Sequence, residues 1–218
     1  MTRNLCTMCA VLGVILGQLT FTSHSFAEIA VSSLESPAGT TPVVDSNQSV
    51  GMRFTTDSDL WRLDSVQLAA GDFVGMSTAP FVVSLYSVSG NIPGTKLMDF
   101  TGANPSTFGT YTFTASSEFI LQPSTSYFIV ASSTENASFY LWGSTDATSF
   151  TALPGWTLVP GNAVTSGGVN WAWNTGPNTP MAAVNVTAVP EPSALVLASL
   201  GLIALGARRF ARRSVRLG

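Results

Sequence analysis

Carboxylates are the side chains through which this chain could carry out acid–base chemistry. Asp57 and Asp59 stand two residues apart, and Asp64 and Asp72 follow shortly after them. Two carboxyl groups about 5–10 Å apart in a cleft can hydrolyse a glycosidic bond. The same residues could bind calcium, but no complete loop pattern surrounds them. Residues 55–59 (TTDSD) are typical of a solvated turn, which is the favoured interpretation, so no catalytic and no metal-binding residues are predicted.

The residues that most often serve as nucleophiles, bases or zinc ligands are confined to the N-terminus. Cys6, Cys9 and His24, which are the only cysteines and histidine, all lie within the first 27 residues. Residues 28–188, called the body below, therefore cannot form a disulfide and lack the usual zinc ligands and the histidine of nucleophilic triads. We predict that the protein is not an enzyme and carries no cofactor.

Tryptophan side chains are the candidates for a binding function. An exposed aromatic face can stack on a sugar ring. Trp171 and Trp173 are two residues apart, so on a strand they point to the same side, and Trp156 follows a Pro-Gly turn where exposure is expected. Packing in the core is the favoured alternative, because β-sandwiches readily bury tryptophan. Trp156, Trp171 and Trp173 are therefore candidate glycan-binding residues.

The elements that position these side chains are predicted to be strands. Residues 81–86 alternate between two faces, residues 109–115 are rich in threonine and aromatic residues, and residues 126–133 and 137–144 flank a predicted hairpin turn. Gly, Pro and Asn separate such runs throughout the body, and no convincing helical pattern occurs within it. We predict an all-β fold, an antiparallel β-sandwich of jelly-roll type over residues 28–188.

Charge is distributed unevenly along the chain. All twelve acidic residues lie between Glu28 and Glu191, whereas only three of the nine basic residues do, namely Arg53, Arg62 and Lys96. Nucleic-acid binding depends on Lys and Arg that neutralise phosphates. A nucleic-acid partner is therefore excluded by this interpretation.

The first 27 residues have the pattern of a secretory signal peptide. Arg3 supplies a positive start and residues 10–19 form an apolar run. Small residues at Ser25 and Ala27 predict cleavage before Glu28. We therefore expect a signal helix at the N-terminus, and we expect the Sec machinery and signal peptidase as partners.

The C-terminus is predicted to cross a membrane. Residues 193–207 carry no charge, and at ~1.5 Å per residue they cover ~22 Å of a ~30 Å hydrocarbon core. Extension with snorkelling arginines gives a transmembrane helix over about residues 193–210; an amphipathic surface helix is disfavoured because the run has no polar stripe. By the positive-inside rule the body lies outside the cytoplasm, and the cytoplasmic anchor consists of Arg208, Arg209, Arg212 and Arg213.

The order of these C-terminal elements resembles a known sorting signal. Pro190, Glu191 and Pro192, an apolar stretch and then ARRFARRS (207–214) are similar to the PEP-CTERM signal of Gram-negative bacteria. The resemblance implies a signal over residues 189–216 in which the triplet is recognised by an exosortase, an integral-membrane protease-transpeptidase. It also implies a cut near the triplet, which releases the body or transfers it to the cell surface, in bacteria that make extracellular polysaccharide.

The body itself resembles the choice-of-anchor R domain over about residues 49–186. The similarity rests on FVVSLYSVSGNIPGTKL (81–97), a strand with YTFT (111–114), LQPSTSYFIVAS (121–132) and a strand that contains tryptophan. This resemblance implies an extracellular β-rich domain without an established activity, and it assigns no site residues.

The favoured function is that of an exported, non-enzymatic bacterial surface or extracellular-matrix protein that an exosortase processes. The alternative is a carbohydrate-binding module for extracellular polysaccharide, which the tryptophans motivate. A glycan-acting enzyme is the least favoured, because only the aspartates could carry it.

Overall fold

The described part of the chain is built from strands, along most of which apolar residues alternate with more polar ones. The computed structural model describes residues 26–72, 79–134, 139–166, 170–176 and 178–189, which belong to one unit, Phe26–Val189. Within these ranges every regular element is a strand, and all strand pairs are antiparallel. The prediction of an all-β antiparallel sandwich is confirmed.

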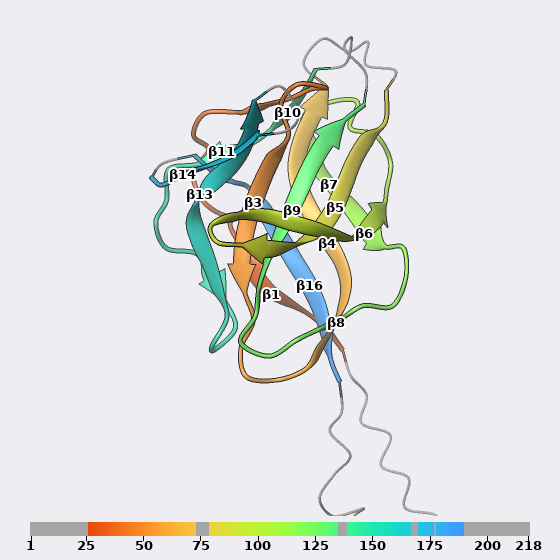
Figure 1. The fold of residues 1–218 in the computed structure, drawn as a ribbon, viewed down its shortest axis with the longest axis vertical. Helices are drawn as coiled ribbons and strands as arrows, with labels where there is room; N and C mark the ends of the chain where they lie inside the picture. Colours follow the sequence, from red (N-terminus) through yellow and green to blue (C-terminus); the bar gives the residue numbers. More distant parts are fainter. Residues whose placement is uncertain (1–25, 73–78, 135–138, 167–169, 177, 190–218) are drawn as a thin grey trace, which may run out of the picture. The chain divides into compact units, whose positions relative to one another are not determined.

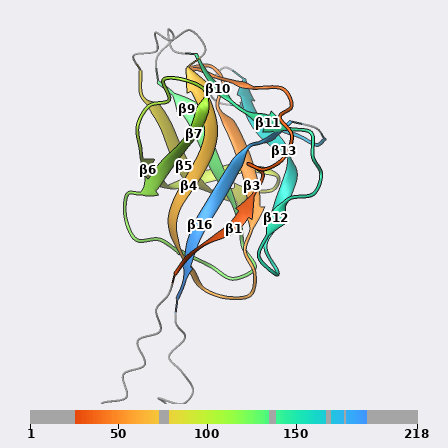
Figure 2. The ribbon, with the colours of Figure 1, turned by 180° about the vertical axis from the view of Figure 1, so that it is seen from behind.

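The strands form two layers, which Figures 1 and 2 show from opposite sides. The first layer contains, in spatial order, β12 (Thr151–Ala152), β1 (Ala27–Ser32), β16 (Ala182–Ala188), β4 (Trp61–Asp72) and β7 (Gly109–Ala115). The second contains β5 (Phe81–Ser89), β9 (Ser126–Ser133), β3 (Val50–Thr55), β13 (Thr157–Ser166) and β14 (Asn170–Asn174).

One long strand joins the two layers. β6 (Ile92–Thr101) pairs with β5 over most of its length, and its last residues, Phe100 and Thr101, pair with β7. β2 (Val43–Val44), β8 (Ile120–Leu121) and β10 (Tyr140–Trp142) extend the first layer. β11 (Ser144–Thr145) and β15 (Thr179–Pro180) form a separate two-stranded sheet. Hydrogen bonding therefore continues from one layer into the other through β6.

The main core lies between the layers, where each strand places alternate residues. In β5, Phe81, Val83 and Leu85, which the alternation places on one face, are all buried in this core, which confirms the alternation. β16 contributes Val184 and Val186 to the same core. Each fully buried side chain of this kind stabilises the fold by about 1.5–3 kcal/mol. Both layers therefore depend on one shared apolar core.

The predicted N-terminal signal helix and the C-terminal transmembrane helix lie outside the described residues. Within the ranges that the structure does describe, no helix is long and apolar enough to cross a membrane. Both helices therefore stay predictions from the sequence.

Three tyrosines of the fold differ in the acidity of their hydroxyl groups. The Tyr111 hydroxyl donates to the carbonyl oxygen of Thr107 at 2.7 Å and accepts from the backbone amides of Ser106 and Thr107. These contacts, first those with Thr107, lower the pKa of Tyr111 to about 8. Burial raises the pKa of Tyr127 and of Tyr140.

We expect the ultraviolet absorbance of phenolate to rise in separate steps when the folded protein is titrated. The first step, near pH 8, belongs to Tyr111, and a Tyr111→Phe variant should lack it. Because the unfolded pKa is about 10, ionisation of Tyr111 adds stability that is fully present above that value and is lost as the pH falls through about 8. A first step that persists in Tyr111→Phe would contradict this assignment.

Candidate functional site

The last strand of the body, β16, lies inside the first layer and not at its edge. It pairs with β1 on one side and with β4 on the other, and its register with β4 runs from Ala182 opposite Leu68 to Ala188 opposite Trp61. The alternation in AAVNVTA buries Ala182, Val184 and Val186 completely. The chain is thus an integral part of the sheet up to Ala188.

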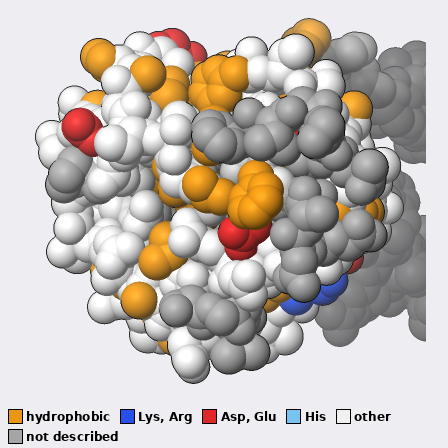
Figure 3. All heavy atoms as spheres, turned by 90° about the horizontal axis from the view of Figure 1, so that it is seen from above, with side chains coloured by type: hydrophobic (Ala, Val, Ile, Leu, Met, Phe, Trp, Pro, Cys, Tyr) orange, Lys and Arg blue, Asp and Glu red, His pale blue; other side chains and the backbone are white. Residues whose placement is uncertain are grey.

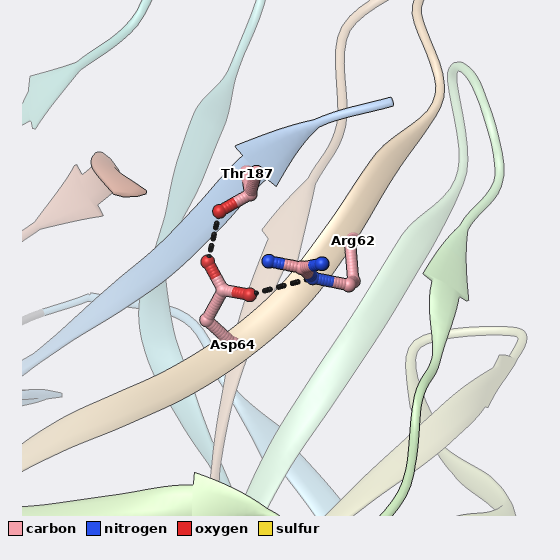
Figure 4. A network of polar contacts seen from close by, with 3 residues as sticks. All are labelled: Arg62, Asp64 and Thr187. Atoms are coloured by element: carbon pink, nitrogen blue, oxygen red, sulfur yellow. Dashed lines mark hydrogen bonds and ion pairs between the residues drawn. The ribbon is translucent and has the colours of Figure 1, made fainter. Parts of the chain in front are cut away.

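Backbone and side-chain bonds also hold the end of β16. The amide of Val189 donates to the carbonyl oxygen of Leu60 at 3.1 Å. The Thr187 hydroxyl donates to Asp64 Oδ2 at 2.5 Å, and Asp64 Oδ1 accepts from Arg62 Nε at 2.9 Å (Figure 4). Described structure therefore reaches the residue that directly precedes Pro190.

A Thr187→Val substitution should lower the free energy of unfolding by about 1–2 kcal/mol, because it removes a hydrogen bond to a carboxylate and leaves Asp64 with one partner fewer. Denaturant-induced unfolding of the isolated body would measure the change. Thr112→Val, at an exposed position of β7, is the matched control and should change stability by less than about 0.5 kcal/mol. Equal losses in both variants would show that the contact with Asp64 contributes nothing.

The two ends of the body lie side by side. Ala27, at the start of β1, is opposite Thr187, and Glu28 is opposite Val186. Figures 1 and 2 show the start of β1 next to the end of β16 at the lower end of the molecule, which we call the base. With cleavage before Glu28, as predicted, the first residue of the mature chain would already be paired with the last strand.

The base contains a hollow of about 700 Å³. Its lining includes Asp57, Asp59 and Glu28, so the structure brings two of the four predicted aspartates together. Asp57 Oδ1 accepts hydrogen bonds from Trp61 Nε1 at 2.8 Å and from the Asp59 amide at 3.0 Å. Asp57 thus builds the turn between β3 and β4, as the favoured interpretation of TTDSD has it.

The other two aspartates lie elsewhere. Asp64 contacts Arg62 and Thr187, and Asp72 lies at the end of β4 opposite Tyr140. Among the described residues, no group of three His, Cys, Asp or Glu side chains could hold a metal ion. The carboxylates that line the hollow therefore do not form a recognisable metal-binding group among the described residues.

The expectation that Trp156 is exposed is wrong. Its side chain is only 3% exposed, and its ring stacks on Phe54 at 6.1 Å and meets the edge of Trp61 at 5.8 Å. The physical reason is the turn before it. The Trp156 amide donates to the carbonyl oxygen of Leu153, and Gly155 adopts a φ of +83°, so the chain reverses and places the indole over the core. Trp156 is therefore a core residue and no candidate for glycan binding.

Trp171 and Trp173 lie on one face of β14, as predicted from their spacing, and both are half-buried. They pack on the outer face of the second layer against a small cluster that includes Phe128. The Trp173 ring lies edge-on to Phe128 at 5.8 Å, and the Arg53 guanidinium carbon is 4.8 Å from its centroid. The structure thus brings these two candidates together and separates both from Trp156.

The three basic residues of the body each have a partner. Arg62 pairs with Asp64 and Lys96 with Asp99 at 3.0 Å, while Arg53 donates to Asn91 and covers Trp173. Figure 3, which views the end opposite the base, shows few charged side chains among the described residues of that face. The described surface therefore shows no basic patch of the kind that nucleic acids require.

These features define an all-β body whose described strands extend to Ala188. Residues 188–213 match the PEP-CTERM protein-sorting motif, which confirms the predicted sorting signal. The motif implies an exported protein that is made as a membrane-anchored precursor and processed by an exosortase. Its first residue, Ala188, is also the last residue of β16.

Neither the search of curated proteins nor the search of solved structures found a match. The resemblance of the body to the choice-of-anchor R domain therefore stays a prediction. Pro190, Glu191 and Pro192 as recognition residues, and the arginines as the cytoplasmic anchor, lie outside the described residues and stay predictions too. The sequence alone did not indicate Leu60 or Thr187, and it gave Asp64 only as a candidate carboxylate, because these residues hold the end of β16 through pairings between distant segments.

Proposed function

We propose that this is a non-enzymatic protein of the cell surface or extracellular matrix, which is tethered after export, trimmed at the Pro-Glu-Pro triplet and then retained at or near the surface. The observation that carries the proposal is the junction at Ala188, where the sorting motif begins as the last strand ends. A cut beyond this residue leaves every strand of the body in place, so trimming yields a complete folded domain.

Intact-mass measurement of the endogenous protein from cell envelopes and medium tests this proposal. The expected mass lacks the tail that carries Arg208, Arg209, Arg212 and Arg213. A variant in which alanine replaces Pro190, Glu191 and Pro192 should keep the tail and accumulate in the membrane fraction. A wild-type protein that keeps its tail would contradict the processing step.

A carbohydrate-binding module is the second candidate, favoured by the exposed parts of Trp171 and Trp173 on one outer face. Tyr86 and Val88 lie half-buried beside them in the same cluster. The stack of a ring on a sugar is worth about 0.5–1.5 kcal/mol, by analogy with aromatic pairs.

Co-sedimentation of the isolated body with extracellular polysaccharide purified from the source organism tests this second candidate. Trp171→Ala should weaken retention roughly three- to tenfold, whereas Leu97→Ala, at an exposed position on β6, should leave it unchanged. The polymer length should stay constant, because we propose no enzymatic activity. Retention that is lacking in the wild type, or equal in both variants, would exclude the module.

A further inference from the structure

The strands of the second layer contain almost no charged residues. β5, β9, β3, β13 and β14, which lie side by side in Figure 1, carry no aspartate and no glutamate. Arg53 of β3 is the one charged residue in these five strands. The first layer differs, because β4 alone carries Arg62, Asp64 and Asp72. The second layer therefore has a local excess of positive charge, in a chain whose acidic residues outnumber its basic ones.

Strand register places Arg53 near the tryptophans of β14. Phe54 is buried in the main core, so its neighbour Arg53 points to the outer face of the layer. Ala163 of β13 is paired with Gly51 of β3 on one side and with Trp173 of β14 on the other. Because Gly51 and Ala163 are the smallest residues, the indole of Trp173 can reach across β13 to Arg53.

The guanidinium of Arg53 is oriented but not neutralised. Its central carbon is 4.8 Å from the centroid of the Trp173 ring, and Nη1 donates to Asn91 Oδ1 at 3.0 Å in an exposed position. Both of these partners are uncharged. Arg62 and Lys96, in contrast, each pair with an aspartate. Among the described residues no carboxylate pairs with Arg53, so its guanidinium keeps its charge and spare N–H donors for another molecule.

These features select the chemistry of a ligand. A guanidinium pairs best with a carboxylate, through two parallel N–H···O bonds. An aromatic ring can stack on a sugar ring, and Trp171 lies on the same face of β14 as Trp173, about 6.5–7 Å along the strand. A polysaccharide with acidic units offers both groups. A nucleic acid fits less well, because it carries a phosphate on every nucleotide and this face offers a single cation.

We propose that the outer face of the second layer binds an acidic polysaccharide, with Trp171 stacked on one sugar unit and Arg53 paired with the carboxylate of that unit or the next. Trp173 holds the guanidinium in place. This inference deepens the carbohydrate-binding candidate of the proposed function and rests on it. It adds the charge of the polymer, and it makes Arg53 the residue that distinguishes acidic from neutral sugars.

Co-sedimentation of the exported protein, purified from the source organism, tests the inference. The probe is the fraction of that organism's extracellular polysaccharide that an anion exchanger retains. Its matched partner is the same fraction after chemical reduction of the carboxylates to primary alcohols. The wild type should bind the acidic form about tenfold more tightly than the reduced form, as expected for one hydrogen-bonded charge pair.

Substitutions assign this difference to one residue. Arg53→Gln should weaken binding of the acidic form about tenfold and leave binding of the reduced form unchanged, because only the acidic form carries the carboxylate. Arg53→Lys keeps the charge without the planar fork and should lose less. Arg62→Gln is the matched control, because Arg62 is exposed and lies in the first layer, and it should bind both forms like the wild type. Trp171→Ala should weaken binding of both forms by the same factor, roughly three- to tenfold.

Four results would overturn the inference. The first is an extracellular polysaccharide without an acidic fraction, and the second is equal binding of the acidic and reduced forms by the wild type. The third is an equal loss for both forms in Arg53→Gln, which would show that Arg53 acts only by supporting Trp173 or the fold. The fourth is tighter binding of single-stranded oligodeoxythymidylate than of the acidic polymer, which would indicate a nucleic-acid face. Equal binding of both forms would leave the carbohydrate-binding candidate standing, whereas a wild type that retains no polysaccharide would contradict that candidate too.

Discussion

A Val184→Asp substitution in β16 is expected to destroy the folded body. Val184 lies between Val31 of β1 and Val66 of β4 in the register of the first layer, and all three side chains are fully buried. A carboxylate there loses the apolar contacts and is left without a partner, which should cost at least about 4 kcal/mol. That loss is a large fraction of the 5–15 kcal/mol that typically separates folded from unfolded domains.

Circular dichroism and denaturant titration of the isolated body would measure the effect. Asn185→Asp places the same side chain at the next, half-buried position of the same strand and should cost at most about 1 kcal/mol. Similar losses in both variants would contradict the central position of Val184. The first layer cannot be completed until β16, the last strand among the described residues, has joined it.

The second large effect concerns Trp156, where two substitutions should differ sharply. Trp156→Ala removes a ring that stacks on Phe54 and should lower the free energy of unfolding by about 3–5 kcal/mol. Trp156→Phe keeps an aromatic ring in the core. It also removes an indole N–H that has no hydrogen-bond acceptor among the described residues. An unsatisfied buried donor costs about 1–3 kcal/mol, so Trp156→Phe should stay within about 1 kcal/mol of the wild type.

Denaturant-induced unfolding of the two variants side by side would test this difference. A loss in Trp156→Phe as large as that in Trp156→Ala would mean that the N–H makes a contact on which the fold depends. The result also matters for the glycan experiment. Reduced retention of Trp156→Ala by polysaccharide would report unfolding, whereas reduced retention of Trp171→Ala would report a contact.

Much of the local structure could be predicted from single segments. The alternation in residues 81–86 depends only on the two-residue period of a strand, and the structure confirms it. Burial of Trp156 could not be predicted in this way. Its exposure was inferred from the Pro-Gly turn, but the direction of the ring depends on how that turn sits above Phe54, a residue 102 positions earlier in the chain.

The sequence by itself determined the all-β class and the sorting signal that marks the protein as exported and processed, because period-two alternation and a triplet–apolar–arginine order are local patterns. Only the tertiary structure decided that β16 lies between β1 and β4, that Val189 bonds to Leu60, and that Asp57 and Asp59 share a hollow with Glu28. These relations join segments far apart in the chain. They arise from the pairing of strands and the burial of one common core, which no short stretch of sequence specifies.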